Sequence, residues 1–247
     1  MAKIALLTIA TDKYISFLEP LHKSIFLNFL PEHEKTLFVF TDKDINYTNT
    51  NTIKINHLPW PITTLMRFFY FTNIADVLKT FDYVYYIDSD MLVHSNINEE
   101  ILPVNNEIIA TKHFYQQHST GTYETNTKST AYVEATDALY GKYCQACFFG
   151  ANSQTFVKMS EELNQNINID LKNNYIALWH DESHFNKYIL NNYCILLHSG
   201  YTHPPWIHEK NNENPVKLLH LNANSSGIKT INIISQSLEE WTTPPSL

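Results

Sequence analysis

The sequence predicts an α/β fold in which helices cover one mostly parallel β-sheet. Short runs rich in β-branched and aromatic residues, typical of buried strands, alternate with segments whose apolar residues recur at helical spacing. These segments are long enough to place a helix between successive strands, which is the connection that parallel strands require. We therefore expect a Rossmann-like layered sheet that binds its ligands beyond the carboxyl ends of the strands.

The chain begins with a strand followed by a helix. The first strand is expected in Lys3–Ala10, a run of apolar and β-branched residues. Apolar side chains recur at helical spacing over Ile15–Leu30, which predicts the helix. Pro20 suits the first turns of that helix, where no amide donor is needed, and Pro31 ends it.

The alternation then continues. Strands are expected over Thr36–Thr41 and Thr52–Asn56, and a second helix over Ile62–Thr80. The strand expected next, Asp82–Asp90, is strongly apolar and ends in two acidic residues. This strand is the element around which we expect the functional site to be organised.

Two carboxylates, Asp88 and Asp90, close that strand. Residues two apart on a strand point the same way, so both acids are expected to face one spot beyond the strand. Carboxylates held close together repel each other unless a cation lies between them, and oxygen ligands favour Mg²⁺ or Mn²⁺. The alternative is a solvated turn in which the two acids merely end the strand.

The composition excludes several classes of protein. With 44% hydrophobic and 17% charged residues, the 247-residue chain is an ordinary globular protein that can bury a large core. Its net charge of −8 argues against a nucleic-acid binder, which needs a basic surface. No apolar run has transmembrane length, so we expect no transmembrane anchor. Three cysteines are too few for a disulfide framework and indicate the cytoplasm.

The scarcity of glycine narrows the choice of ligand. The chain has five glycines, and none forms a dinucleotide-binding or Walker loop. A sheet of this kind that binds a nucleotide without such a loop needs a metal to neutralise the phosphates, which Asp88 and Asp90 could hold. This combination favours a nucleotide-sugar transferase over a dehydrogenase or a kinase.

A second cluster of chemically active residues spans Trp179–Tyr188, where two histidines, an aspartate and a glutamate follow a tryptophan. The acidic start followed by Phe185 and Tyr188 predicts a helix with Asp181 as its N-cap. Part of the cluster is therefore explained by the helix dipole alone. The number of reactive side chains exceeds what a cap requires.

Two patterns leave alternatives open. His180 and His184 lie four residues apart, as in zinc hydrolases, but that motif needs Glu directly after the first His, where this chain has Asp181. Cys144 and Cys147 have the spacing of a redox pair or of half a zinc site, although the chain has no second pair.

The chain resembles glycosyltransferase family 6, the retaining α-1,3-galactosyl- and N-acetylgalactosaminyltransferases related to the blood-group A and B enzymes. It looks most like the short, soluble bacterial-type members. Matching motifs follow one another over most of the chain: Ile9-Ala-Thr-Asp-Lys-Tyr14, Phe38-Val-Phe-Thr-Asp42, Trp60-Pro-Ile-Thr-Thr-Leu-Met-Arg67, Asp88-Ser-Asp90, Thr122-Tyr-Glu124, Ala131-Tyr132 and Trp179-His-Asp-Glu-Ser-His-Phe-Asn-Lys-Tyr188. The last motif is the most specific.

The resemblance implies a single GT-A catalytic domain over residues 1–247. Residues 1–92 would bind the nucleotide, residues 93–230 the acceptor, and residues 231–247 would form a C-terminal tail. The implied activity moves galactose or N-acetylgalactosamine from a UDP-sugar to the 3-hydroxyl of an acceptor glycan, with Mn²⁺ or Mg²⁺. The alternative is a nucleotide-sugar or glycan-binding module without turnover.

The resemblance also implies roles for residues of the nucleotide half. Ile9, Thr11 and Tyr14 would line the uridine. Asp88 would contact ribose and metal, and Asp90 would bind the metal against the diphosphate.

Further residues are implied to handle the sugars. Arg67 would approach the donor sugar or a phosphate, although a lone arginine on an apolar helix is otherwise usually ion-paired. Asp181 would bind hydroxyls of the donor sugar, and Glu182 would act at the anomeric carbon as nucleophile or charge stabiliser. His113 and Trp179 would contact the acceptor.

Two segments depart from the family pattern. Gln145, Ala146 and Cys147 stand at the donor-selecting position, where Ala and Cys leave less room than paired glycines and favour galactose. Beyond Trp206 the match is poor, and the basic residue expected over the diphosphate is Lys217 or Lys229. His220 would reach the metal or belong to a late buried strand.

Overall fold

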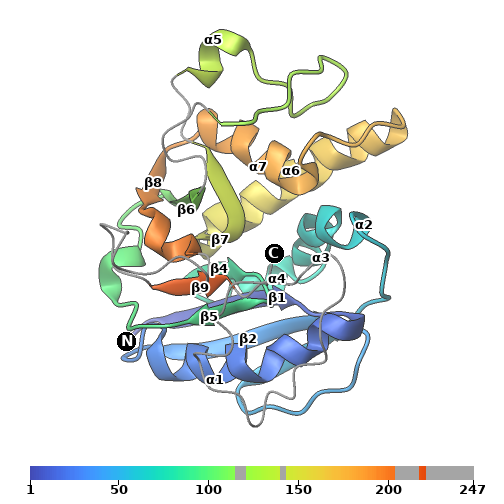
Figure 1. Cartoon of the computed structure of the whole chain (residues 1–247). Helices are drawn as coiled ribbons and strands as arrows, with labels where there is room; N and C mark the ends of the chain where they lie inside the picture. Colours follow the sequence, from blue (N-terminus) through green and yellow to red (C-terminus); the bar gives the residue numbers. More distant parts are fainter. Residues whose placement is uncertain (115–120, 140–142, 204–216, 221–247) are drawn as a thin grey trace, which may run out of the picture.

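The computed structural model describes residues 1–114, 121–139, 143–203 and 217–220. Among these residues, seven strands form one sheet in the order β3-β2-β1-β4-β7-β6-β8, and β5 and β9 form a two-stranded ribbon (Figure 1). The strands are β1 (Lys3–Ile9), β2 (Glu34–Thr41), β3 (Thr50–Lys54), β4 (Tyr83–Ile87), β5 (Met91–Val93), β6 (Ile108–Lys112), β7 (Cys144–Asn152), β8 (Cys194–Leu197) and β9 (Leu218–His220).

Helices cover this sheet and connect its strands. They are α1 (Leu18–Asn28), α2 (Ile62–Leu65), α3 (Arg67–Thr72), α4 (Ala75–Leu78), α5 (Ala135–Ala138), α6 (Ser153–Lys172) and α7 (His180–Leu190), with 3-10 turns at Asp12–Phe17, Glu99–Ile101 and Ser199–Thr202. Within the described part of the chain, no helix combines the length and the apolar character that crossing a bilayer requires.

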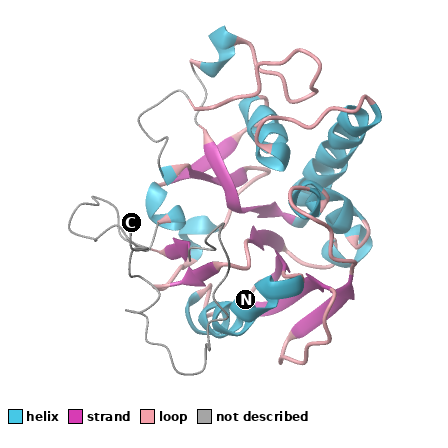
Figure 2. Ribbon diagram, turned by 45° about the vertical axis from the view of Figure 1, so that its right-hand side comes forward, coloured by secondary structure: helices cyan, strands magenta, loops and turns pink. Residues whose placement is uncertain are grey.

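The strand directions confirm the predicted α/β fold class. Strands β1 to β4 run parallel to one another, and β6 runs parallel to β8. Strand β7 lies between these two groups and runs antiparallel to both β4 and β6. The sheet is therefore mostly parallel, and Figure 2 shows its strands flanked by helices.

Each face of the sheet packs against its own set of helices. On one face, side chains of α3, α6 and α7, including Phe68, Phe156 and Phe185, pack against β1, β2, β4 and β7. On the other face, Leu21 and Ile25 of α1 pack together with the β5–β9 ribbon. In Figure 1, α1 lies at the bottom of the molecule, whereas α6 and α7 lie toward the top.

The central strand β4 is fixed by close packing against β7. The ring of Tyr85 stacks on Phe148, and its hydroxyl donates to the carbonyl oxygen of Ile101 at 2.7 Å. A β-carbon at Gly150, on the neighbouring strand, would lie only 2.1 Å from Tyr85 Cδ1. Glycine is therefore required at this position, and its absence of a side chain lets β7 approach β4.

Several predicted elements differ in extent. The expected helix Ile62–Thr80 is three short helices, interrupted at Met66 and Ile74, whose ψ angles are 0° and 20°. Its many aromatic and β-branched residues are weak helix formers, and packing on the sheet sets their path instead. The expected helix Ile15–Leu30 starts as a 3-10 turn before α1, and the expected strand Thr52–Asn56 is β3.

Candidate active site

A cavity of about 670 Å³ opens where β1 and β4 end. Parallel neighbours present their carboxyl ends at the same edge of a sheet, so residues that follow the two strands meet there. Asp88 and Asp90 line the cavity from β4, and Ile9, Thr11 and Tyr14 line it from β1 and the turn after it. The structure thus brings together five residues that the sequence analysis assigned to nucleotide or metal binding.

His57 is a cavity residue that the sequence analysis missed. It lies shortly beyond the end of β3, and its Nδ1 is 3.0 Å from the hydroxyl of Thr11. The signal that could have found it is its place after a parallel strand, at the same edge as the acids. The remaining lining residues are Asp12, Lys13, Leu58, Trp60, Thr63, Thr64, Tyr86 and Ser89.

Arg67 lies beneath the cavity, with only 3% of its surface exposed. Its Nη2 is 3.6 Å from Asp88 Oδ1, and its Nε is 3.0 Å from Asp181 Oδ2. Its Nη1 donates to the carbonyl oxygen of Ala146 at 2.6 Å, and the guanidinium lies over the ring of Tyr86. The alternative noted from the sequence, an ion-paired arginine, is the arrangement in this structure. Arg67 thereby connects the β4 carboxylates with α7 and β7.

The prediction that Asp181 caps helix α7 is wrong. The N-cap position is Trp179, without a capping side chain, and Asp181 belongs to the first turn. Its carboxylate turns inward to Arg67 instead, where it compensates a buried guanidinium that would otherwise be an unpaired charge. Burial raises the pKa of Asp181 to about 6, although Arg67 acts in the opposite direction.

The carboxylate of Glu182 is held by two donors at the start of β7. The hydroxyl of Tyr143 donates to Oε1 at 2.9 Å, and the backbone N–H of Ala146 donates to Oε2 at 3.0 Å. Burial raises the pKa of Glu182 to about 7, and the donors from Ala146 and Tyr143 limit the rise. Glu182 does not line the 670 Å³ cavity and reaches it only through Asp181 and Arg67.

Asn186 fastens α7 to β7 and was also missed. Its side chain accepts from the Cys144 N–H and donates to the Cys144 carbonyl oxygen, both at 2.8 Å. It also donates to the carbonyl oxygen of Glu182 at 2.9 Å. A fully buried amide in a helix costs free energy unless it is satisfied, and here its bonds fix the position of Glu182 relative to the strand.

The predicted donor-selecting segment is part of β7. Gln145 is partly exposed, whereas Ala146 and Cys147 are buried. Ala146 contacts Arg67 through its carbonyl and Glu182 through its amide, so the segment lies between these two charged side chains. Cys144 and Cys147 belong to different core clusters, on opposite faces of the sheet, and both are free thiols. The redox-pair and half-zinc-site alternatives are therefore not supported.

His113 and Trp179, the predicted acceptor residues, lie on two sides of this region. The N–H of His113, just after β6, donates to the carbonyl oxygen of Tyr143 at 3.0 Å, and the two rings are 5.8 Å apart. Trp179 begins α7 with 47% of its surface exposed, and its N–H donates to the Ser183 hydroxyl. Neither residue lines the large cavity.

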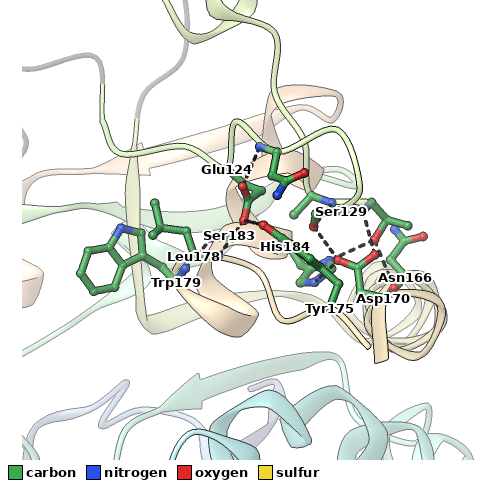
Figure 3. A network of polar contacts seen from close by, with 12 residues as sticks. Glu124, Ser129, Asn166, Asp170, Tyr175, Leu178, Trp179, Ser183 and His184 are labelled. Carbon is green, nitrogen blue, oxygen red and sulfur yellow. Dashed lines mark hydrogen bonds and ion pairs between the residues drawn. The ribbon is translucent and has the colours of Figure 1, made fainter. Parts of the chain in front are cut away.

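A network of buried polar groups supports the turn that carries Trp179 (Figure 3). The carboxylate of Glu124 accepts from the N–H of Leu178 and the N–H of Asn126, each at 2.7 Å, and from the Tyr175 hydroxyl at 3.2 Å. Leu178 directly precedes Trp179, so Glu124 fixes the chain where it enters α7. The sequence motif Thr122-Tyr-Glu124 thus has a structural role at this turn.

The same network holds His184. Asp170 of α6 accepts from the Ser129 hydroxyl at 2.5 Å and from the Thr130 N–H at 2.8 Å, and it lies 3.5 Å from His184 Nε2 (Figure 3). His180, by contrast, packs edge-on against Trp60 at 4.8 Å. The zinc-hydrolase alternative is not supported, because His180 and His184 contact different residues. Among the described residues, no three acidic, His or Cys side chains gather as a metal site.

The comparison with known proteins decides the family. A family model described as glycosyltransferase family 6 matches residues 2–232, nearly the whole chain. The chain belongs to this family. Its fold is accordingly the GT-A fold, and its sheet is the nucleotide-sugar scaffold expected from the sequence.

Relatives within glycosyltransferase family 6 include both bacterial and animal proteins. The O-antigen biosynthesis glycosyltransferase WbnI of Escherichia coli is 30% identical over 83% of this chain and 88% of its own length. Histo-blood group ABO system transferase 2 of Rattus norvegicus is 26% identical over 76% of this chain and 59% of its own length. Globoside alpha-1,3-N-acetylgalactosaminyltransferase 1 of Gallus gallus is 23% identical over 76% of this chain and 57% of its own length.

The residues at the end of β4 fit a divalent metal. Asp88, Asp90 and Tyr14 line the same cavity, and burial together with the nearby charges of Asp90 and Asp88 raises the pKa of Tyr14. A hard cation such as Mn²⁺ or Mg²⁺ binds one or two protein carboxylates and completes its shell with phosphate and water. Asp88 and Asp90 form a donor set of this kind in this family 6 glycosyltransferase.

Part of the C-terminal segment lies next to this site. The backbone of His220 pairs with Met91, the residue after Asp90, which confirms its place in a late strand. Its side chain lies outside the described residues. Lys217 Nζ is 3.4 Å from Glu100 Oε1. Residues 204–216 and 221–247, Lys229 among them, lie outside the described residues.

Proposed function

We propose that the chain is a retaining glycosyltransferase that moves galactose or N-acetylgalactosamine from a UDP-sugar to the 3-hydroxyl of an acceptor glycan. The observation that carries this proposal is the continuous set of charged groups from β4 to α7. Arg67 lies within ion-pair distance of both Asp88 and Asp181, and Glu182 follows Asp181. This arrangement joins a diphosphate-binding cavity to a carboxylate that can act on the donor sugar.

The nucleotide is proposed to bind in the cavity of residues 1–92. Ile9, Thr11 and Tyr14 would line the uridine, since they line the same cavity as the β4 carboxylates. Residues 93–230 would bind the acceptor, with His113 and Trp179 in contact with it, and residues 231–247 would form a tail. Exposed indole rings commonly offer an apolar face to a sugar, and Trp179 is half exposed.

Asp88 and Asp90 would hold Mn²⁺ or Mg²⁺. When bound, such an ion neutralises the diphosphate and assists the departure of UDP. Asp88 also accepts from the Tyr86 hydroxyl at 2.5 Å, which fixes its orientation at the strand end. The protein's contribution at this position is to aim two carboxylates at one cavity.

Glu182 would stabilise the reacting carbon. The bond between the anomeric carbon and the diphosphate breaks with its electron pair going to UDP, the acceptor oxygen forms the new bond, and the proton of the acceptor hydroxyl passes to the departing diphosphate. Positive charge develops at the carbon between these events, and an ionised carboxylate on the opposite face stabilises it. Asp181 would bind the sugar hydroxyls, while Arg67 holds Asp181 in place.

Galactose is the favoured donor sugar. Ala146 and Cys147 are buried beside Arg67 and Glu182, and their side chains leave less room than glycines would. An N-acetyl group needs more space than a hydroxyl. The free state of all three cysteines also suits the cytoplasm, which is the expected location.

A donor-hydrolysis screen tests the function without knowledge of the acceptor. The protein is incubated with Mn²⁺ and each of several UDP-sugars, and released UDP is measured. We expect slow hydrolysis of UDP-galactose above the other donors. Binding of UDP-sugars without hydrolysis or transfer to any glycan would favour the alternative, a binding module without turnover.

A further inference from the structure

Tyr143 is a buried tyrosine to which the proposed function assigns no role. Only 3% of its surface is exposed, and it directly precedes β7. Its hydroxyl donates to Glu182 Oε1 while the Ala146 N–H donates to Oε2. With one donor on each oxygen, both from the start of the same strand, the carboxylate is fixed in position and rotation.

The ring of Tyr143 is itself held by a separate segment. Tyr123 packs edge-on against it, with ring centroids 5.2 Å apart. Gly121, with φ of 90°, lies so close that a β-carbon there would be 2.4 Å from Tyr143 Cβ. Glu124 anchors the same segment to the chain that enters α7. Segment Gly121–Glu124 therefore forms a wall against which the ring packs.

Three side chains and one backbone amide influence the charge of Glu182. Burial raises its pKa, and the hydrogen bond from Tyr143 lowers it. The negative charge of Asp181 raises the pKa further, whereas the positive charge of Arg67 lowers it. Cys147 also lies close, since Glu182 contributes to raising its pKa. Of these groups, Tyr143 donates directly to the carboxylate, as does the Ala146 amide. A donor of this kind stabilises the ionised form.

We propose that Tyr143 is a positioning residue of the transfer reaction: its hydroxyl keeps Glu182 ionised and aimed from the start of β7, and segment Gly121–Glu124 holds its ring. This proposal rests on the proposed role of Glu182. It gives the Thr122-Tyr-Glu124 motif a function in catalysis beyond its structural role at the entry to α7.

The test compares two tyrosine-to-phenylalanine variants. Tyr143→Phe removes the donor to Glu182 and nothing else. Tyr85→Phe is the matched control, because it also removes a buried hydroxyl donor, here to the carbonyl oxygen of Ile101, outside the site. For Tyr143→Phe we expect about a tenfold lower kcat at pH 7, since a hydrogen bond to a charged group is lost. Donor KM should change little.

The pH profile identifies the cause. Loss of the donor raises the pKa of Glu182, so the acidic limb of kcat/KM should move up by about one pH unit in Tyr143→Phe. Tyr85→Phe should keep the wild-type profile. An unchanged limb in Tyr143→Phe, or a loss of rate matched by an equal loss in the control, would overturn the proposal.

Adding Glu182→Gln separates this inference from the proposed function. If Tyr143 acts through Glu182, Tyr143→Phe should cause no further loss in a Glu182→Gln background. Additive losses would mean that Tyr143 acts independently and would refute the inference. Wild-type turnover in Glu182→Gln alone would refute the proposed function itself, whereas an inactive Glu182→Gln with a normal Tyr143→Phe would refute only the inference.

Discussion

Two groups of buried or partly buried carboxylates lie around α7, and their partners differ. In the loop network (Glu124, Ser129, Asp170 and His184), backbone amides and hydroxyls from nearby loops donate to the acids. In the cavity cluster (Arg67, Asp88, Asp181 and Glu182), two carboxylates share one guanidinium. The pKa values of Asp181 and Glu182 are raised by burial, to about 6 and about 7.

This difference distinguishes carboxylates that stabilise the fold from carboxylates that can take part in the reaction. Carboxylates that accept several hydrogen bonds from loops stabilise the fold, because removing them leaves those donors unsatisfied. In the cavity cluster, burial raises the pKa of Asp181 and Glu182 toward neutrality against the opposing effect of Arg67, so a substrate or metal can shift their protonation. The same substitution should therefore have opposite consequences in the two groups.

The largest effect is expected at the metal site. Asp90→Asn should abolish turnover while changing the melting temperature little, because Asp90 lies beyond the end of β4 at the cavity. Kinetics and thermal unfolding on one preparation measure both quantities. EDTA should inactivate the wild type, and added Mn²⁺ should restore it. Full activity in EDTA would contradict the metal assignment.

The next largest effect concerns Glu182. Glu182→Gln should bind UDP-galactose almost normally but lose at least about 100-fold in kcat, on the order of 3 kcal/mol, because its charge acts in the transition state. Glu161→Gln, on an exposed position of α6, is the control. In the wild type, kcat/KM should rise with pH through about 7, since Glu182 must lose its proton. A stability loss with intact kcat would contradict the catalytic role.

In the loop network, substitution should lower the stability of the fold and leave turnover nearly unchanged. Asp170→Asn removes the charge that faces His184 and should lower the free energy of unfolding by about 2 kcal/mol. For a chain of this size, that corresponds to roughly 4–8 °C in Tm. Turnover per folded molecule should stay within about twofold. A large loss of kcat at unchanged Tm would place this network in the chemistry.

The smallest effect is expected in donor choice. Replacing Ala146 and Cys147 by Gly should raise the use of UDP-N-acetylgalactosamine relative to UDP-galactose by about fivefold or more, since one methylene is worth ~1–3 kcal/mol. The ratio of kcat/KM values for the two donors measures this independently of the folded fraction. An unchanged ratio would show that these side chains do not contact the sugar.

The sequence predicted best those features of the fold that neighbouring residues determine. An apolar run ending in Asp88 and Asp90 located both β4 and the cavity edge, because strand direction follows from neighbouring residues. The expected strand Asp82–Asp90 was too long, since β4 ends at Ile87 and the two acids lie in the turn that follows, so strand alternation does not set their direction. The pairing of Arg67 with Asp181 could not be foreseen, since it joins positions more than a hundred residues apart. The same ion pair made the capping prediction for Asp181 wrong.

Residues recognised only by their distant partners were also missed. Tyr143 and Asn186 gain their roles from Glu182 and Cys144, and neither has a distinctive local pattern. Asn186 did offer one signal: a polar amide of low helix propensity stands within a helix among apolar residues. Such a residue is retained when its hydrogen bonds fix one element against another.

The antiparallel direction of β7 affects how this chain can change the donor sugar that it prefers. Because β7 runs against β4, with Phe148 opposite Ile87, residues 144–147 extend past the end of β4. There the register of β7 against β6 shifts, since Ala110 faces Phe149 whereas Thr111 faces Gln145. An irregular strand can change its length at such a point without exchanging the faces of the side chains beyond it, which regular pairing does not allow. New donor preferences should therefore arise at residues 146–148 by a change of length as well as by substitution.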